Sequence, residues 1–278
     1  MNVVLSTLNS KFIHSSLALR YLKAYGQAHG QAYDIVEYTI NMPVLHILSD
    51  ITERNIDILG FACYIWNIEM TLHVVDMVKA VRPDIKIILG GPEVSFTADE
   101  ILNRCAAVDY VVQGEGEEAF YQLISALIAG KDGLEEQIPG VRGRHISGRL
   151  LGSTDTVEVK DLSTIPFPYV EEDMIDLEHK IIYYESSRGC PFSCQYCLSG
   201  NKNTVRFFPQ ERTFKELQWF IDHKVKQVKF VDRTFNCAPH HHRPMMEFMR
   251  DADTETNFHL EMEPELMTEW ETNILCET

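Results

Sequence analysis

Residues 56–91 read IDILGFACYIWNIEMTLHVVDMVKAVRPDIKIILGG. The stretch begins and ends with the apolar runs Ile56–Cys63 and Ile85–Leu89, and Ile68–Val81 between them has helical periodicity. Short runs of this composition are typical of parallel strands whose two faces are both covered by helices. The stretch therefore predicts a strand, a helix and a second strand that is parallel to the first.

The same alternation continues on both sides of this stretch. The remaining predicted strands are Val3–Leu8, Tyr33–Tyr38 and Asp109–Val112. Further helices are predicted over 15–29, where Ser15 or Ser16 can act as the cap, and over 117–129. Five strands in this rhythm predict an α/β fold of the flavodoxin-like, Rossmann-like type, a doubly wound domain over residues 1–135.

The second half of the chain has a different organisation. Glycine and proline punctuate residues 136–180, which we interpret as a connector with a few short strands. A second series of βα units is predicted over residues 181–278.

Composition restricts the class of protein. The chain has 278 residues, 45% of them hydrophobic and 24% charged, as in ordinary globular proteins. Its net charge of −16 disfavours a nucleic-acid partner, because it repels a phosphate backbone. We expect a cytoplasmic protein with no membrane association, because no apolar run approaches the roughly 18 residues of a membrane span and no signal peptide is recognisable. Seven cysteines, an odd number, favour metal or redox use over disulfides.

Three of the cysteines lie within eight residues. Residues 187–198 read SRGCPFSCQYCL, so Cys190, Cys194 and Cys197 share one loop after a predicted strand. This spacing lets three thiols reach one inorganic centre, and an iron–sulfur cluster with three thiolate ligands keeps one iron open for another ligand. A structural zinc loop is the alternative, although zinc sites normally use paired Cys-x-x-Cys units and no second pair is present.

The pattern Cys190-x-x-x-Cys194-x-Tyr196-Cys197 resembles the signature of radical S-adenosylmethionine (radical SAM) enzymes. The resemblance implies that the three cysteines are the metal ligands of a 4Fe-4S cluster and that the fourth iron binds S-adenosylmethionine. It also implies that Tyr196 lies near the adenine and that reductive cleavage releases a 5′-deoxyadenosyl radical.

A polar segment follows a later strand. Residues 229–236 read KFVDRTFN and place Asp232 and Thr234 at the carboxyl end of a predicted strand, where barrel enzymes carry functional groups. Related enzymes often have a similar Asp-x-Thr-Phe segment, so we predict that both are catalytic residues near the cofactor. A capped strand-to-helix turn is the alternative. We expect the histidines at 240–242 to lie at an exposed helix start.

Two loops of the N-terminal domain are candidate ligand loops, because a doubly wound sheet binds ligands at the carboxyl ends of its strands. The candidate cofactor-binding residues are Gly90, Gly91 and Pro92 in the first loop, Gly114, Glu115, Gly116 and Glu117 in the second, and His14 after the first strand. The second loop is a poor phosphate cradle because its carboxylates repel anions. For His14, a helix start without a metal role is the alternative. Trp66 follows the third strand. Its ring can pack either on a flat macrocycle or in the protein core, and both interpretations remain.

Taken together, the two glycine loops and the three-cysteine motif resemble the cobalamin-dependent subclass of radical SAM enzymes over nearly the whole chain. The resemblance implies cobalamin in the first domain, the beginning of a radical SAM partial TIM barrel in the second, and most commonly methyl transfer to an unactivated carbon of a small-molecule or peptide substrate. The Asp-x-His-x-x-Gly motif that supplies a cobalt ligand in other cobalamin proteins is absent.

Two alternatives remain at this point. A methylthiotransferase-like radical SAM enzyme would need three more N-terminal cysteines, whereas only Cys63 and Cys105 are present. A non-catalytic cobalamin- and cluster-binding fragment is the other.

The chain length and a local positive charge lead to two further expectations. After Cys197 only 278 − 197 = 81 residues follow, enough for about three of the roughly six βα units of such a barrel. We therefore expect a chain truncated within the barrel, with little or no turnover by itself. Residues 181–250 carry 11 basic and 6 acidic side chains, a balance of 11 − 6 = +5, which predicts docking of an acidic flavodoxin- or ferredoxin-type electron donor.

Overall fold

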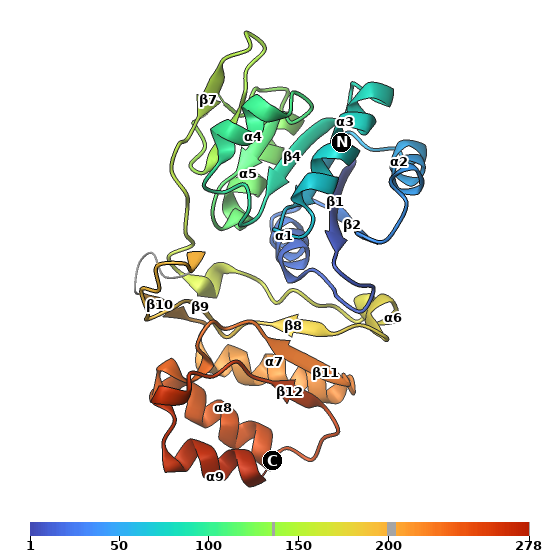
Figure 1. Ribbon diagram of the computed structural model, residues 1–278. Coiled ribbons are helices and arrows are strands. Elements are labelled where there is room, and N and C mark those ends of the chain that lie inside the picture. Colours follow the sequence, from blue (N-terminus) through green and yellow to red (C-terminus); the bar gives the residue numbers. More distant parts are fainter. Residues whose placement is uncertain (135–136, 199–203, 278) are drawn as a thin grey trace. The chain divides into compact units, whose positions relative to one another are not determined.

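The computed structural model describes residues 1–134, 137–198 and 204–277. The chain divides into two compact units. Unit 1 comprises Met1–Val159 and Ile165–Val170, and unit 2 comprises Lys160–Thr164 and Glu171–Thr278. Each unit has a sheet of its own that contains parallel strands (Figure 1).

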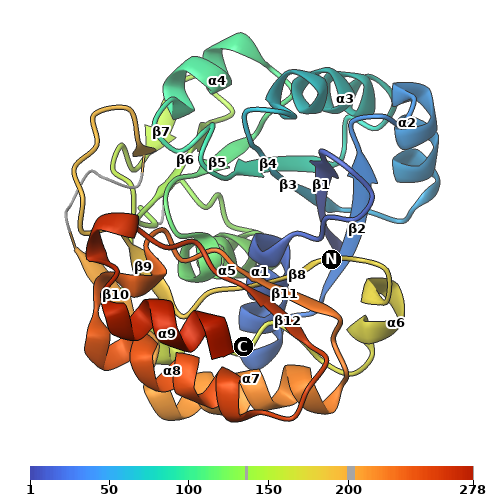
Figure 2. The same ribbon diagram turned by 60° about the horizontal axis from the view of Figure 1, so that its bottom comes forward.

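Unit 1 is built on a seven-stranded sheet with the order β2-β1-β3-β4-β5-β6-β7, which can be followed in Figure 2. The strands are β1 (Val3–Asn9), β2 (Tyr33–Thr39), β3 (Ile58–Ala62), β4 (Lys86–Gly90), β5 (Tyr110–Val112), β6 (Val141–Arg144) and β7 (Leu150–Gly152). β1 to β5 are parallel, and their order confirms the predicted doubly wound, flavodoxin-like fold. β6 and β7, from the predicted connector, extend the sheet in antiparallel fashion.

Helices cover both faces of this sheet. They are α1 (Leu17–Ala28), α2 (Val44–Glu53), α3 (Ile68–Val81), α4 (Ala98–Arg104) and α5 (Gly116–Ile128). On β1, Val4 and Leu8 join the core beneath α2, α3 and α4, whereas Val3 and Leu5 join the core beneath α1 and α5. Because both faces are buried, β1 and β3 lack the polar alternation of a half-exposed strand.

Two of these helices were not predicted from the sequence. α4 has seven residues, too few for a clear helical period, whereas α2 has ten and its apolar residues Val44, Ile47, Leu48 and Ile51 do have helical spacing. The predicted cap of α1 is confirmed at Ser16, whose hydroxyl accepts a hydrogen bond from the Leu19 amide. None of the helices in the described ranges has the length and apolar character needed to cross a lipid bilayer.

Unit 2 contains a three-stranded parallel sheet with the order β12-β11-β8. Its strands are β8 (Ile182–Tyr184), β11 (Gln227–Phe230) and β12 (Asn257–His259), and β9 (Ser187–Gly189) pairs separately with β10 (Val205–Phe207). Its helices are α6 (Asp173–Leu177), α7 (Gln210–Asp222), α8 (Pro239–Asp251) and α9 (Glu269–Glu277), with short 3-10 turns at η1 (Leu162–Thr164), η3 (Phe235–Cys237) and η4 (Pro264–Leu266). The predicted second βα series is therefore present.

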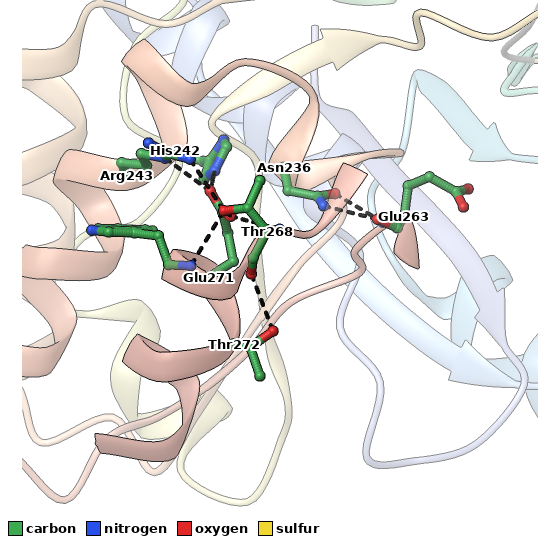
Figure 3. A network of polar contacts seen from close by, with 8 residues as sticks. Asn236, His242, Arg243, Glu263, Thr268, Glu271 and Thr272 are labelled. Atoms are coloured by element: carbon green, nitrogen blue, oxygen red, sulfur yellow. Dashed lines mark hydrogen bonds and ion pairs between the residues drawn. The ribbon is translucent and has the colours of Figure 1, made fainter. Parts of the chain in front are cut away.

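A buried carboxylate joins α9 to α8 (Figure 3). Glu271 accepts hydrogen bonds from His242 Nε2 (3.1 Å), Arg243 Nε (2.8 Å) and the Thr268 amide (2.9 Å). Thr268 and Glu271 are three residues apart at the start of α9, in the arrangement of a capping box. Burial would raise the pKa of Glu271, but the hydrogen bonds from Thr268, His242 and Arg243 outweigh it and hold the pKa below its usual value.

The histidines at the start of α8 correct one expectation. His241 and His242 are buried, so the predicted exposed helix start is wrong for both. The His241 ring lies 4.4 Å from the ring of Phe207 on β10, and His242 bonds to Glu271 on α9. Their partners come from distant parts of the chain, which the local pattern could not indicate.

Candidate functional sites in the two units

In unit 1 the candidate site is the edge of the sheet where the parallel strands end. The loops that follow β1, β3, β4 and β5 begin at residues 10, 63, 91 and 113, and the register of the strands brings them to the same edge. The predicted cofactor residues of unit 1 all lie at or next to this edge, as expected for a doubly wound sheet.

The buried side chain of Asn67 ties the β3 loop to β1. Its amide nitrogen donates to the carbonyls of Leu8 (3.2 Å) and Ala62 (3.1 Å), and its oxygen accepts from the Tyr64 amide (2.7 Å). The sequence analysis did not single out Asn67. The sequence signal for this role is its position between β3 and α3, where an Asn side chain can hydrogen-bond to the backbone of a turn.

This arrangement presents Trp66 to the outside of unit 1. The indole N–H donates to the Leu8 carbonyl (3.3 Å), and the ring stacks on Tyr64 with centroids 4.6 Å apart and planes 3° from parallel. Trp66 is 47% exposed, which rules out the core-packing alternative. Other large apolar side chains are exposed in the same group of loops and at the start of α2, namely Phe12, Ile13, Leu45, Ile65 and Phe96.

The two glycine loops are joined by a serine. Gly91 has a φ of +103°, and a Cβ there would lie 2.6 Å from the Cys63 carbonyl oxygen, so only glycine fits. The buried Ser95 hydroxyl donates to the Gly91 carbonyl (2.8 Å) and accepts from the Gly114 amide (3.0 Å). Gly90 ends β4 and its carbonyl accepts from the Cys63 amide, while Pro92 is exposed.

The second glycine loop is held by the segment that follows β7. Gly114 forms a parallel bridge with Val157, and a Cβ at Gly114 would lie 2.2 Å from the Val157 carbonyl oxygen. The Glu115 carboxylate accepts from the Val159 amide (2.7 Å), and Glu117 is buried in the first turn of α5, which begins at Gly116. The need for glycine at 114 thus follows from this close backbone approach, and a contact with a cofactor stays a prediction.

His14 lies in the β1 loop, which a buried ion pair supports. Glu37 on β2 accepts from the Ser16 amide (2.6 Å) and from Arg20 (3.3 Å), and both charged side chains are buried. Asn9 also donates to Glu37 (3.2 Å) and to the His14 carbonyl (3.1 Å). The loop that carries His14 is therefore held at its base, and a role for the imidazole toward a cofactor stays a prediction.

In unit 2 the candidate site is the loop after β9. Cys190 is 8% exposed, Cys197 is partly buried and donates its amide to the Cys194 carbonyl (3.0 Å), and Cys194 is exposed. Tyr196 is 93% exposed. The start of the loop needs glycine, because Gly189 has a φ of +104° and pairs closely with the backbone that leads into β10.

The three thiols fit an iron–sulfur cluster by their chemistry. All are free thiols, and they lie on one short loop. In the part of the chain that the structure describes, no group of three or more Cys, His, Asp or Glu side chains is gathered as a metal site. The ligand role of Cys190, Cys194 and Cys197 therefore stays a prediction from the motif.

Asp232 and Thr234 follow β11 and reach the beginning of the cysteine loop. The Thr234 hydroxyl lies 3.5 Å from the Cys190 sulfur. Asp232 accepts hydrogen bonds from the Ser186 amide (2.9 Å), the Ser186 hydroxyl (2.8 Å) and the Ser187 hydroxyl (2.5 Å). Burial raises the pKa of Asp232, and the bonds from both serines oppose this effect. The sequence analysis missed both serines, whose only signal was their place before Gly189.

The hydrogen-bond network around Asp232 extends to α8. His241 Nε2 lies 3.1 Å from the Ser186 hydroxyl. Burial lowers the pKa of His241 to about 4, so the ring is neutral near pH 7. Because the Ser186 hydroxyl donates to Asp232, it is available to accept a hydrogen bond from the His241 N–H.

Known proteins share parts of this sequence. The sequence model of the family described as "B12 binding domain" matches residues 3–124. The 2-(S-pantetheinyl)-carbapenam-3-carboxylate methyltransferase of Streptantibioticus cattleyicolor is 31% identical over 194 residues, which are 66% of this chain and 28% of that protein. The cobalamin-dependent radical SAM methyltransferase TokK of Streptomyces tokunonensis is 30% identical over 219 residues, 75% of this chain and 32% of that protein. The chain thus spans about a third of the length of these relatives.

A solved structure shares the fold. The radical S-adenosylmethionine methyltransferase TsrM from Kitasatospora setae, solved with cobalamin and a [4Fe-4S] cluster bound, aligns with a TM-score of 0.78 and 14% identity. The alignment covers 100% of this chain and 59% of that chain.

Proposed function

Because residues 3–124 match the sequence model of the B12-binding domain family and the chain has the fold of part of a cobalamin-dependent radical SAM enzyme, we propose that it binds cobalamin, a 4Fe-4S cluster and S-adenosylmethionine for methyl transfer to an unactivated carbon. The substrate class, a small molecule or peptide, is part of this proposal. The observation that carries it is the coincidence of the B12-binding match with an exposed apolar edge around Trp66.

The apolar edge suits a large, flat ligand. A corrin ring offers a broad apolar face, and burying apolar area contributes about 25 cal/mol per Å². The Tyr64–Trp66 stack is held by the Trp66 indole hydrogen bond and by Asn67, so little side-chain freedom would be lost on binding. We propose that Trp66 packs against the macrocycle and that Gly91 and Gly114 hold the neighbouring loops around it.

The cysteine loop would hold the second metal centre. When bound, the cluster supplies the electron that cleaves S-adenosylmethionine and cobalamin carries the methyl group. Cys190, Cys194 and Cys197 would ligate iron as thiolates. The exposed ring of Tyr196 would be free to pack against the adenine, and Thr234 would lie beside the Cys190 sulfur.

Cobalamin binding can be tested directly. The desalted chain, reconstituted with its cluster under anaerobic conditions, is mixed with cobalamin, desalted again and examined by absorbance. We expect stoichiometric corrinoid with a base-off spectrum. Trp66→Ala should weaken binding at least about tenfold by removing apolar contact area. The matched variant Trp270→Phe, which alters a tryptophan of unit 2, should leave binding unchanged. Failure of the wild-type chain to retain cobalamin would contradict the proposal.

We also propose a protein partner that supplies electrons to the cluster. The net positive charge of residues 181–250 favours docking of an acidic flavodoxin- or ferredoxin-type donor. The rate of cluster reduction by such a donor should fall as salt is added, because salt screens charge attraction. A rate that does not respond to salt would count against this docking.

A further inference from the structure

The environment of Asp232 indicates whether this carboxylate exchanges protons with a substrate or holds neighbouring segments of its own chain in place. Asp232 is 1% exposed, and three donors from Ser186 and Ser187 converge on its two oxygens. A group that exchanges protons with a substrate must reach it at hydrogen-bond distance. The oxygens of Asp232 are instead directed at two residues of its own chain, which are 46 and 45 positions earlier.

These two serines control where the cysteine loop begins. Ser186 follows β8 and Ser187 begins β9, so the carboxylate spans the junction between the two strands. Cys190 is the first residue after β9, and its sulfur contacts Thr234, two residues beyond Asp232. The segment that follows β11 therefore holds the beginning of the cysteine loop at two points.

We propose that Asp232 is a positioning residue that fixes the β8–β9 junction and thereby places Cys190 for cluster binding. This role rests on the proposed function, because it assigns Cys190 to the cluster. Asp232 acts through Ser186 and Ser187, and the Ser186 hydroxyl extends the contact to His241 on α8. This role differs from the catalytic role near the cofactor that the sequence motif predicts for Asp232.

The hydrogen-bond donors around Asp232 predict how strongly its substitution by Ala or by Asn should weaken the β8–β9 junction. Asp232→Ala leaves one buried N–H and two buried hydroxyls without their acceptor, which is costly in a site closed to water. Asp232→Asn can keep the bond from the Ser186 amide through its oxygen. Its NH₂ can donate to the serine hydroxyls if they rotate, and the Ser186 hydroxyl can then donate to the neutral His241 ring. Asn should therefore restore much of what Ala loses.

The first test uses the metal-free chain, so it does not depend on cluster assembly. Iodoacetamide alkylation of each cysteine is followed by mass spectrometry under native conditions. Cys190 should react slowly in the wild type because it is 8% exposed. In Asp232→Ala its rate should rise at least about tenfold through local opening, with an intermediate rate in Asp232→Asn. The exposed Cys194 is the internal control, and its rate should not change.

A matched variant and a folding check complete this test. Asp222 is an exposed aspartate at the end of α7 that accepts a hydrogen bond from Gln218, so Asp222→Ala should leave the Cys190 rate unchanged. Circular dichroism verifies that each variant is folded. If Asp232→Ala does not fold, Ser187→Ala removes a single donor and should still accelerate Cys190. An unchanged Cys190 rate in a folded Asp232→Ala or, failing that, Ser187→Ala chain would overturn the proposal.

The second test measures the cluster itself. After reconstitution, Asp232→Ala should hold less than about half of the wild-type iron and ~400 nm absorbance, with partial recovery in Asp232→Asn. A catalytic acid or base would instead leave cluster content intact in both variants, and that result would overturn the positioning role. If the wild type takes up no cluster, the proposed function fails, and the alkylation rates still decide whether Asp232 positions Cys190.

Discussion

Gly114→Ala tests whether the second glycine loop depends on a close backbone approach. Gly114 has a φ of +88°, and a Cβ there would lie 2.2 Å from the Val157 oxygen and 2.7 Å from the Val157 nitrogen. Gly30 has a similar φ of +82°, with nothing within 4 Å of the same position. Gly30→Ala is therefore a control that has the same backbone strain without the collision.

The expected cost can be divided into two parts. Both variants place a side chain in the left-handed region, at about 1–2 kcal/mol. Only Gly114→Ala must also displace Val157, an overpacking cost of about 1–3 kcal/mol. The displacement weakens the hydrogen bonds that join Val157 to Gln113 and Glu115, at about 1 kcal/mol each. We expect Gly114→Ala to destabilise unit 1 by about 2–4 kcal/mol more than Gly30→Ala.

Urea denaturation can measure this difference in unit 1 alone. The chain has three tryptophans, and two of them, Trp219 and Trp270, lie in unit 2. In a Trp219→Phe/Trp270→Phe background, the fluorescence of Trp66 reports on unit 1. The free energy of unfolding is extrapolated to water for both glycine variants. If Gly114→Ala costs no more than Gly30→Ala, the close approach of Val157 does not constrain this loop.

The remaining predictions concern the cysteine loop, one histidine and one ion pair. Cys194→Ala should remove the ~400 nm absorption of the reconstituted cluster, while Cys276→Ala on α9 should keep it; a full band in Cys194→Ala would disprove the ligand assignment. Burial lowers the pKa of His241 from 6.5 to about 4, so the unfolded chain takes up the proton first and unit 2 should lose stability as pH falls from about 6.5 to 4. The difference between a pKa of 6.5 and one of about 4 limits this loss to roughly 3 kcal/mol. The stability of His241→Gln, measured by unfolding followed by tryptophan fluorescence, should lack this dependence on pH. Glu37→Gln should destabilise unit 1 by about 3 kcal/mol, because it leaves Arg20 buried without its countercharge; a loss below about 1 kcal/mol by the same Trp66 assay would contradict this.

Regular elements were predicted best where the local pattern was strongest. Among the five parallel strands of unit 1, β3, β4 and β5 were recognised because burial on both faces makes them largely apolar, whereas β2 at the edge of the sheet carries Asp34 and Glu37. α4 was missed because it is short, and α2 was missed although its apolar residues have helical spacing. The buried state of His241 and His242 was mispredicted because their partners, Phe207 and Glu271, are not their neighbours in sequence.

The order of the βα units, the loops at the carboxyl edge and the three-cysteine motif could be read from the amino-acid sequence, since periodicity and residue spacing are local properties of the chain. The residues that meet at these loops became known from the three-dimensional fold: Asn67 with Leu8, Gly114 with Val157, and Asp232 with Ser186. Such pairs depend on which strands are neighbours and on their register, and a shift of one residue would turn every side chain to the opposite face.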